Sequence, residues 1–237
     1  MATTCRVCPF QPSCIVAGVE KAGLDKFSDT LLRYAVRGKG RGVFNEGERN
    51  DAFIFLCNGL VKIVKNLPDG RDVILEVLSA FSIVNLSPAS KTSQHPFSAV
   101  TLSDVTELAS IKKGDLFELL NSYPTLGDNL YGHVSKRFVT VFNMLGSMQL
   151  GVKQRTLTIL SFFRGAWGAE DRARYVKIPL TQGELAQLVQ TTPETISRTL
   201  RRLREAQLVR VGPKGELSVA QAALRDYLNE ERYGRTT

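Results

Sequence analysis

One stretch near the C-terminal end, residues 180–204, constrains the fold more than any other part of the sequence. Thr181 is followed three residues later by Glu184, which is the capping-box pattern that begins an α-helix. A second start signal lies at Thr192, because Pro193 would take the first helical position, where its missing N–H costs nothing. The buried stripe of this second helix is predicted from apolar residues at helical spacing, namely Ile196, Leu200 and Leu203. The stretch therefore predicts a helix-turn-helix.

The opposite face of the second helix is polar and mostly basic. It carries Glu194, Ser197, Arg198, Arg201, Arg202 and Arg204. A helix with an apolar back and such a front suits the major groove of DNA. A solvated basic helix in an ordinary domain is the alternative. The two capped helices, the short turn and the hairpin pattern that follows favour DNA binding.

The residue types on this face predict how the roles are divided. The planar fork of Arg198 can bind guanine through O6 and N7, and Glu194 can accept a hydrogen bond from a cytosine amino group. Ser197 can reach a neighbouring base edge. Phosphate contacts, which position a protein without reading sequence, are expected from Thr181, Thr192, Arg201, Arg202 and Arg204.

The charge of the chain also favours a polyanionic partner. The formal net charge of the 237 residues is +8. From Gly151 to the end, 15 Lys and Arg against 9 Asp and Glu give +6 of that total. This asymmetry favours nucleic acid over a membrane surface. The sequence contains no run as long as a transmembrane helix and no apolar signal segment, so we expect a cytoplasmic protein with reduced thiols.

Three of the four cysteines lie close together near the N-terminus. Cys5, Cys8 and Cys14 have the spacing C-x2-C-x5-C, and Cys57 follows in a predicted strand. Thiolates at such spacing can hold an iron–sulfur cluster, which in its common form takes four cysteine ligands, or a zinc ion. Incidental thiols are the alternative, but cysteine is scarce in the rest of the chain.

The region after the cysteines has the rhythm of short strands. A short helix is predicted over Val16–Ser28, and strands are predicted between Leu31 and Ile111. Turn signals at Asn58-Gly59 and Leu67–Gly70 separate the apolar runs. Ser87–Phe97 is predicted to be a loop. Short strands at this spacing predict an antiparallel roll or barrel.

A long helix is predicted from Pro124 to about Leu150. Its apolar positions follow nearly the spacing of a coiled-coil seam, at Leu126, Leu130, Val134, Phe138, Val141, Leu145 and Met148. A helix of this length between two domains pairs more often with its twin, so this seam is the predicted dimer interface. The alternative, in which part of the face packs on its own β-domain, remains open.

The C-terminal part predicts a winged helix-turn-helix. Its other predicted elements are a helix over Thr156–Trp167, a strand over Arg174–Ile178, a hairpin over Leu208–Val211 and Glu216–Val219, and a helix over Ala220–Tyr233. The fold class is therefore α+β. The predicted parts are a cysteine-rich loop (1–18), a cupin-like antiparallel β-roll sensor domain (19–123), a dimerisation helix (124–150) and a DNA-binding domain (151–237).

This order of parts resembles the CRP/FNR family of bacterial transcription regulators over nearly the whole chain. Glu194–Arg198 is similar to the recognition-helix signature of the FNR branch, and Cys5-x2-Cys8-x5-Cys14 is similar to its cluster loop. Val43–Gly47 and Phe55–Gly59 resemble the roll of the family. The resemblance implies a homodimeric DNA-binding regulator that contacts RNA polymerase and reads half-sites like TTGAT. It also implies an oxygen-labile 4Fe–4S cluster that responds to oxygen, redox state or NO.

The sequence departs from the FNR pattern at the fourth cluster ligand. The matching position carries Ala109 in place of a cysteine. Either Cys57, a carboxylate or another ligand completes the site, or the cluster is incomplete; His95 and His133 are further candidate ligands.

Two further departures concern the ligand and the dimer. The cyclic-nucleotide members carry a Gly-Glu and an Arg-Ser pair around the phosphate, and Phe81–Val100 has neither, so no cAMP binding is expected. Val141 stands where the FNR pattern has an acidic residue that opposes dimerisation. We therefore expect the protein to dimerise readily without its cofactor.

Three classes of function remain open from the sequence. The first is a cluster-sensing transcription regulator, and the second is the same architecture gated by another small molecule, zinc or thiol oxidation. The third is a redox enzyme or electron carrier. The sequence has no nucleotide loop, catalytic triad or second cluster motif, so we expect no enzymatic activity.

Overall fold

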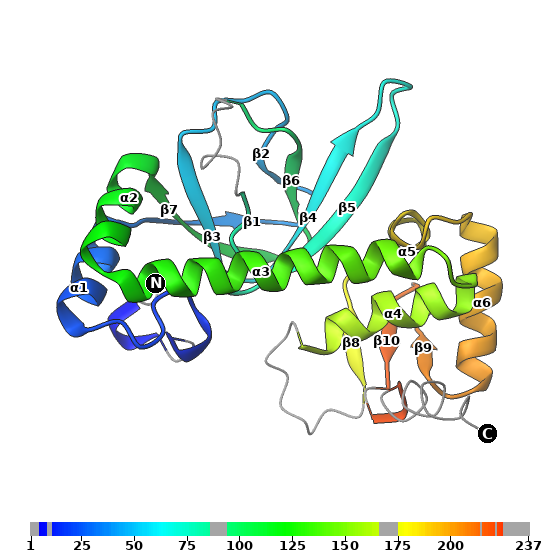
Figure 1. Cartoon of the computed structure of the whole chain (residues 1–237). Helices are drawn as coiled ribbons and strands as arrows, with labels where there is room; N and C mark the ends of the chain where they lie inside the picture. The colour runs from blue at the N-terminus through cyan, green and yellow to red at the C-terminus, as the bar shows by residue number, and fades with distance from the viewer. Residues whose placement is uncertain are drawn as a thin grey trace. The chain divides into compact units, whose positions relative to one another are not determined.

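In the computed structural model, two antiparallel sheets form the N-terminal half of the chain (Figure 1). The first sheet contains, in spatial order, β1 (Leu32–Arg37), β7 (Val105–Lys112) and β3 (Ala52–Asn58). The second contains β2 (Gly42–Phe44), β6 (Ser98–Thr101), β4 (Leu60–Asn66) and β5 (Asp72–Ser79). The predicted antiparallel roll is confirmed. The structure describes residues 5–8, 11–85, 94–165, 175–213, 215–220 and 222–224.

The bend between β3 and β4 requires a glycine. Gly59 has a φ of +96°, and a Cβ atom at this position would lie 2.9 Å from the backbone oxygen of Val105. Only glycine adopts this conformation at no steric cost. The turn predicted at Asn58-Gly59 is therefore a bend, at which the chain continues from β3 in the first sheet to β4 in the second, and both strands pair with the β6–β7 segment.

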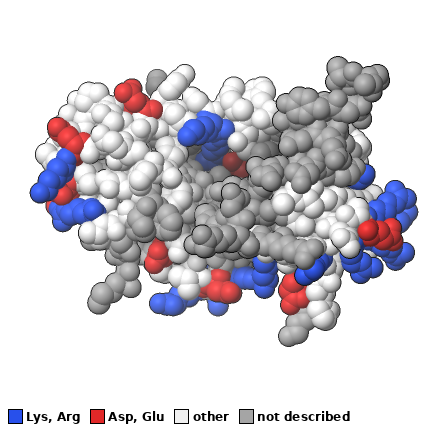
Figure 2. Space-filling view, turned by 90° about the horizontal axis from the view of Figure 1, so that it is seen from below, with Lys and Arg blue, Asp and Glu red and all other residues white. Residues whose placement is uncertain are grey.

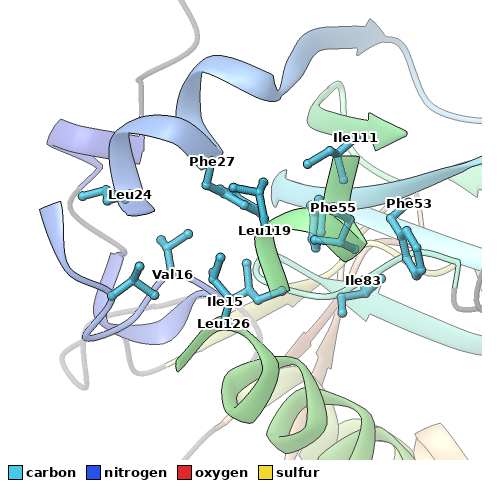
Figure 3. Packing of buried hydrophobic residues seen from close by; sticks show 12 residues of the cluster. Ile15, Val16, Leu24, Phe27, Phe53, Phe55, Ile83, Ile111, Leu119 and Leu126 are labelled. Atoms are coloured by element: carbon cyan, nitrogen blue, oxygen red, sulfur yellow. The ribbon is translucent and has the colours of Figure 1, made fainter. Parts of the chain in front are cut away.

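Alternation along β3 separates two hydrophobic cores. Phe53 and Phe55 belong to a cluster with the N-terminal helices, whereas Ile54 and Leu56 belong to a cluster between the sheets. Because successive strand residues point to opposite faces, one strand can serve both cores. Figure 3 shows the first cluster, in which Phe53 and Phe55 meet Ile83 and Ile111.

Two short helices cover this first cluster. They are α1 (Lys21–Thr30) and α2 (Lys113–Ser122). The helix predicted over Val16–Ser28 begins later than expected, because residues 15–18 form a turn in which Gly18 has a φ of +66°. That conformation cannot continue into a right-handed helix, so α1 starts only at Lys21.

The longest helix is α3 (Pro124–Ser147), which confirms the predicted helix to within three residues of its expected end. Two arginine contacts fasten it to the roll. Arg137 Nε donates to Glu76 Oε2 over 2.9 Å, and Arg137 Nη1 donates to the Ile83 carbonyl over 2.8 Å. Burial raises the pKa of Glu76, and the guanidinium opposes that effect. The sequence pattern did not indicate this buried ion pair.

The C-terminal part contains a small three-stranded sheet and three helices. Its elements are α4 (Val152–Gly165), β8 (Val176–Ile178), α5 (Gln182–Val189), α6 (Pro193–Glu205), β9 (Val209–Val211) and β10 (Leu217–Val219). The sheet order is β8-β10-β9, so the predicted hairpin also pairs with the preceding strand. By compactness the chain divides into Met1–Thr140 and Val141–Thr237.

Some sequence predictions fall outside the described residues. These are the loop over residues 87–93, the ends of two elements at Trp167 and Arg174, and most of the helix predicted over residues 220–233. In the part of the chain that is described, no helix combines the length and apolar character that a bilayer span requires.

Candidate nucleic-acid interface and cysteine site

The first helix of the predicted pair, α5, is capped as its sequence indicates. The Glu184 backbone N–H donates to Thr181 Oγ1 over 3.1 Å, and the Thr181 N–H donates to Glu184 Oε2 over 2.9 Å. These reciprocal bonds form the capping box. The helix ends at Val189, and the C-cap residue Gln190 has a left-handed φ of 54°, which turns the chain toward the second helix.

The second helix, α6, begins at the predicted cap and packs on the predicted face. Thr192 Oγ1 accepts a hydrogen bond from the Thr195 N–H over 3.3 Å, and Pro193 occupies the first helical position. Ile196, Leu200 and Leu203 are all buried. The helix-turn-helix geometry predicted from residues 180–204 is therefore present.

The residues predicted to contact DNA lie on the exposed side of α6. They are Glu194, Ser197, Arg198, Arg201, Arg202 and Arg204, and each of them is exposed. Glu194, Ser197, Arg198 and Arg201 are spaced so that they share one helical face. Figure 2 shows basic side chains gathered at the right-hand edge, on the side where α6 lies in Figure 1. Thr181 and Thr192 are exposed at the two helix starts.

Glu194 is held as a carboxylate by the start of α6. Its own backbone N–H, the Thr192 side chain and the charge of Arg198 all lower the pKa of Glu194. An ionised carboxylate only accepts hydrogen bonds. This is the state that acceptance from a cytosine amino group requires.

Sequence reasoning missed an arginine that joins two turns beside the interface. Arg155 on α4 donates from Nη1 to the Met148 carbonyl over 3.2 Å and from Nη2 to the Gln190 carbonyl over 3.4 Å. Gln190 is the turn residue of the helix-turn-helix, and Met148 follows α3. Arg155 precedes the helix predicted over Thr156–Trp167, which in the structure begins at Val152, and its position gave no signal for such a link.

The predicted wing carries one more exposed cation. Arg210 on β9 lies over the Tyr175 ring, with 3.8 Å between its guanidinium carbon and the ring centroid. The Tyr175 hydroxyl donates to the Gln207 carbonyl over 3.4 Å. The wing strand is thereby fixed against the end of α6.

The structure brings the four cysteines into one neighbourhood. The pKa of Cys57 is raised to about 12, mainly by burial, and further by the nearby Cys14, Cys5 and Cys8 thiols. Burial also raises the pKa values of Cys5 and Cys14. The N-terminal segment and β3, far apart in sequence, therefore meet at the thiols.

Cys57 reaches this neighbourhood through an irregularity in its strand. The register between β3 and β7 shifts between Leu56 and Asn58, so Cys57 is the extra residue of a β-bulge. The neighbours of Cys57 include Cys5 and Cys14, which pack on the cluster that contains Phe55, so Cys57 lies on the Phe55 side of β3; Phe55 pairs with Ala109 on β7. Ala109, which stands at the position of the fourth ligand in the FNR pattern, therefore lies on the same face of the sheet as Cys57.

Arg33 also contacts this site, which the sequence did not indicate. It pairs with Ala109 across β1 and β7, and its Nη2 donates to Cys5 Sγ over 2.8 Å. The two histidines considered as ligands are placed differently. His133 hydrogen-bonds the backbone carbonyl of Cys14, whereas His95 stacks on Phe44 and has Glu48 and Asp51 as its charged neighbours.

The thiols are near one another without forming a closed coordination sphere. Among the described residues, no group of three or more His, Cys, Asp or Glu side chains has the arrangement that holds a metal ion. The donor types fit an iron–sulfur cluster or zinc. The cysteine segment would have to draw in around either group.

The predicted dimer seam divides into a buried and an exposed part. Leu126 is 0% exposed and Leu130 packs on the same core, so these two residues serve their own domain rather than a partner surface. Val134, Phe138, Val141 and Leu145 are exposed, and Met148 is half-buried. The sequence pattern missed the exposed Tyr131, Val139 and Phe142.

Comparison with protein-family models gives two matches that follow each other along the chain. Residues 38–123 match the family described as cyclic nucleotide-binding domain, and residues 154–226 match the Crp-like helix-turn-helix domain. The chain belongs to the CRP/FNR family of transcription regulators. The roll and the DNA-reading half of the CRP/FNR fold are thus both present.

Curated relatives are regulators of the same family. The cyclic AMP receptor protein of Thermus thermophilus is 28% identical over 210 residues, covering 83% of this chain and 89% of the relative. The nitrogen fixation regulation protein FixK of Bradyrhizobium diazoefficiens is 26% identical, covering 84% and 83%. The transcriptional activator protein Anr of Pseudomonas protegens is 23% identical, covering 86% and 84%.

Solved structures share the CRP/FNR fold. FixK2 from Bradyrhizobium japonicum superposes with a TM-score of 0.69 at 16% identity, over 83% of this chain and 96% of FixK2. The c-di-GMP responsive global regulator CLP of Xanthomonas campestris gives 0.68 at 20% identity, over 84% and 99%. These likenesses confirm the predicted α+β architecture.

Proposed function

We propose that the protein is a sequence-specific DNA-binding transcription regulator that acts as a homodimer. The observation that carries this proposal is the exposed, mostly basic face of a doubly capped helix-turn-helix, on which Glu194, Ser197 and Arg198 stand together. The relatives, which are transcription regulators, support it. A dimer of such domains reads two half-sites about one helical turn apart.

The proposed target is a palindrome of TTGAT-like half-sites. Arg198 reads a guanine through its fork, and Glu194 accepts from a cytosine on the complementary strand. Arg201, Arg202 and Arg204, with Thr181 and Thr192, hold the phosphates. RNA polymerase is the further partner that the family resemblance supports.

The proposed input is the neighbourhood of Cys5, Cys8, Cys14 and Cys57. These four thiols supply the ligand set of a 4Fe–4S cluster, whose loss to oxygen or NO would be the signal. Two features of this chain support the site: Cys57 lies at a β-bulge beside the other thiols, and Arg33 donates a hydrogen bond to the Cys5 sulfur. For such a signal to act, the fraction of protein that forms the DNA-binding dimer must differ between the states with and without the cluster.

An iron and sulfide assay on anaerobically purified protein tests this input. A brown protein that air bleaches supports the cluster, whereas a colourless, iron-free protein rules it out. Cys57→Ala should remove iron from the protein, because it removes one of four ligands. Iron retained at the wild-type level in Cys57→Ala would assign the fourth ligand to another residue.

A second input is favoured by one observation, the match of residues 38–123 to a cyclic nucleotide-binding domain. In that case a small molecule in the roll gates the same DNA-binding half. Because Phe81–Val100 lacks the phosphate-binding pairs, we propose a ligand other than cAMP. Calorimetry with cAMP should then give no binding heat, and iron-free protein that still binds the palindrome would favour this second input over the cluster.

A further inference from the structure

One face of α3 holds the backbone that follows Cys14. The side-chain amide of Asn129 donates to two carbonyls, to Ile15 over 2.7 Å and to Ala17 over 2.8 Å. One turn further along α3, His133 hydrogen-bonds the carbonyl of Cys14 itself. Three carbonyls within four residues, those of Cys14, Ile15 and Ala17, are therefore bound to the same helix.

Apolar packing reinforces these polar contacts. Leu126 lies in one buried cluster with Ile15 and Val16, and Leu130 and Cys14 pack against the cluster. Figure 3 shows Ile15, Val16 and Leu126 close together. Positions 126, 129, 130 and 133 are spaced i, i+3, i+4 and i+7, so they form a single helical face. This face of α3 therefore packs against the cysteine segment.

The amide of Asn129 uses its full donor capacity in this contact. An asparagine side chain has two N–H donors on one nitrogen, and both acceptors here are carbonyl oxygens. The contact therefore fixes the orientation of the amide. Neither an aspartate, which only accepts, nor an apolar residue of the same size can replace it.

The same two turns of α3 also carry exposed apolar side chains. Tyr131 in these turns is 75% exposed, and Phe138, more than one turn beyond residue 133, is 62% exposed. An α-helix is stiff over two turns, because each residue is tied by its backbone hydrogen bonds to the next turn. A shift of the face around Asn129 must therefore move Tyr131 as well.

We propose that Asn129 is a positioning residue that makes the beginning of α3 move with the cysteine segment. The proposal rests on the proposed function only in taking the cysteine segment as the input. It does not depend on whether a cluster, zinc or thiol modification changes that segment. Asn129 thus connects the input to the helix whose exposed face is expected to meet a second copy.

Hydrogen exchange on the full chain tests the connection. Amide exchange is measured by mass spectrometry over residues 11–19 and 126–133, before and after the cysteines are labelled with N-ethylmaleimide, with labelling verified by peptide mass. In wild type, labelling should speed exchange in residues 126–133 by about tenfold, the effect of losing roughly one net hydrogen bond. In Asn129→Leu, the same labelling should leave this exchange unchanged.

The matched control is Asn143→Leu, which alters an exposed asparagine on the same helix. It should respond to labelling as wild type does. Exchange in β3 and β7 shows whether each variant keeps the folded roll. The comparison of labelled with unlabelled wild type tests the proposal even if a variant does not fold. An equal response in Asn129→Leu and wild type, or no response in wild type, would overturn the proposal.

The outcome is separable from that of the proposed cluster. If wild type contains no iron but exchange in α3 responds to labelling, the coupling is supported and the proposed cluster is ruled out. Iron-loaded wild type whose α3 does not respond to labelling overturns the coupling and leaves the cluster in place.

Discussion

The helices α6 and α3 differ in how their two faces are used. In α6 the apolar face is buried and the polar face is exposed, with no exceptions among the residues predicted for DNA contact. In α3 the apolar residues follow one regular seam, yet Leu126 is buried in its own domain and Phe138 is exposed. Amphipathic spacing therefore suffices to assign the faces of a short helix on one small core. It does not suffice for a long helix that is apolar on more than one side.

The largest expected effect separates the two ends of the α3 seam. Leu126→Ala should lower the free energy of unfolding by about 2–5 kcal/mol, because it leaves a cavity in a closed core. Leu145→Ala, at an exposed position, should change it by less than about 0.5 kcal/mol in the monomer. Urea denaturation at low protein concentration measures both. Equal losses in the two variants would contradict the division of the seam.

The next effect concerns the exposed part of α3 as a dimer surface. Val141→Glu should weaken the dimer of apo-protein by about a hundredfold, because like charges brought together across an interface cost several kcal/mol. Sedimentation at micromolar concentration should show a wild-type dimer and a Val141→Glu monomer. Wild-type apo-protein that sediments as a clean monomer would contradict the expectation.

A smaller effect tests the polar face of α6. Arg198→Ala should cost about 1–3 kcal/mol of DNA-binding free energy and relax specificity at one base pair. Fluorescence anisotropy at fixed salt, on the TTGAT palindrome and on singly substituted sites, measures this. Arg202→Ala is the matched control, and it should weaken binding to all sites alike and reduce the salt dependence. If Arg198→Ala behaved in the same way, Arg198 would contact phosphate only.

The smallest effect tests the start of α6. Thr192→Ala should lower the free energy of unfolding of the C-terminal part by about 1 kcal/mol, because it removes the acceptor for the Thr195 N–H. Thr192→Ser keeps the hydroxyl and should be nearly neutral. Thermal unfolding followed by circular dichroism distinguishes them, and equal losses in the two variants would show that the methyl group matters rather than the cap.

Local signals in the sequence determined much of this molecule. Hydrogen bonds and packing between residues close in sequence account for the caps at Thr181 and Thr192 and for the buried stripe of α6. The same holds for the antiparallel roll, whose strands alternate and are separated by turn residues. The C-x2-C-x5-C motif identified Cys5, Cys8 and Cys14 as candidate ligands, because these three residues lie close together in the sequence.

Only the tertiary structure decided how distant segments meet. The bulge at Cys57 depends on the register between β3 and β7, and the contact of Arg33 with Cys5 depends on where the N-terminal segment lies against β1. In the sequence Asn129 is an ordinary polar residue of a helix, and only the structure shows that it binds the carbonyls of Ile15 and Ala17. Such contacts join residues far apart along the chain, so no local periodicity carries them. The contacts of Arg33 and Asn129 form because the cysteine segment packs on the core between the roll and α3.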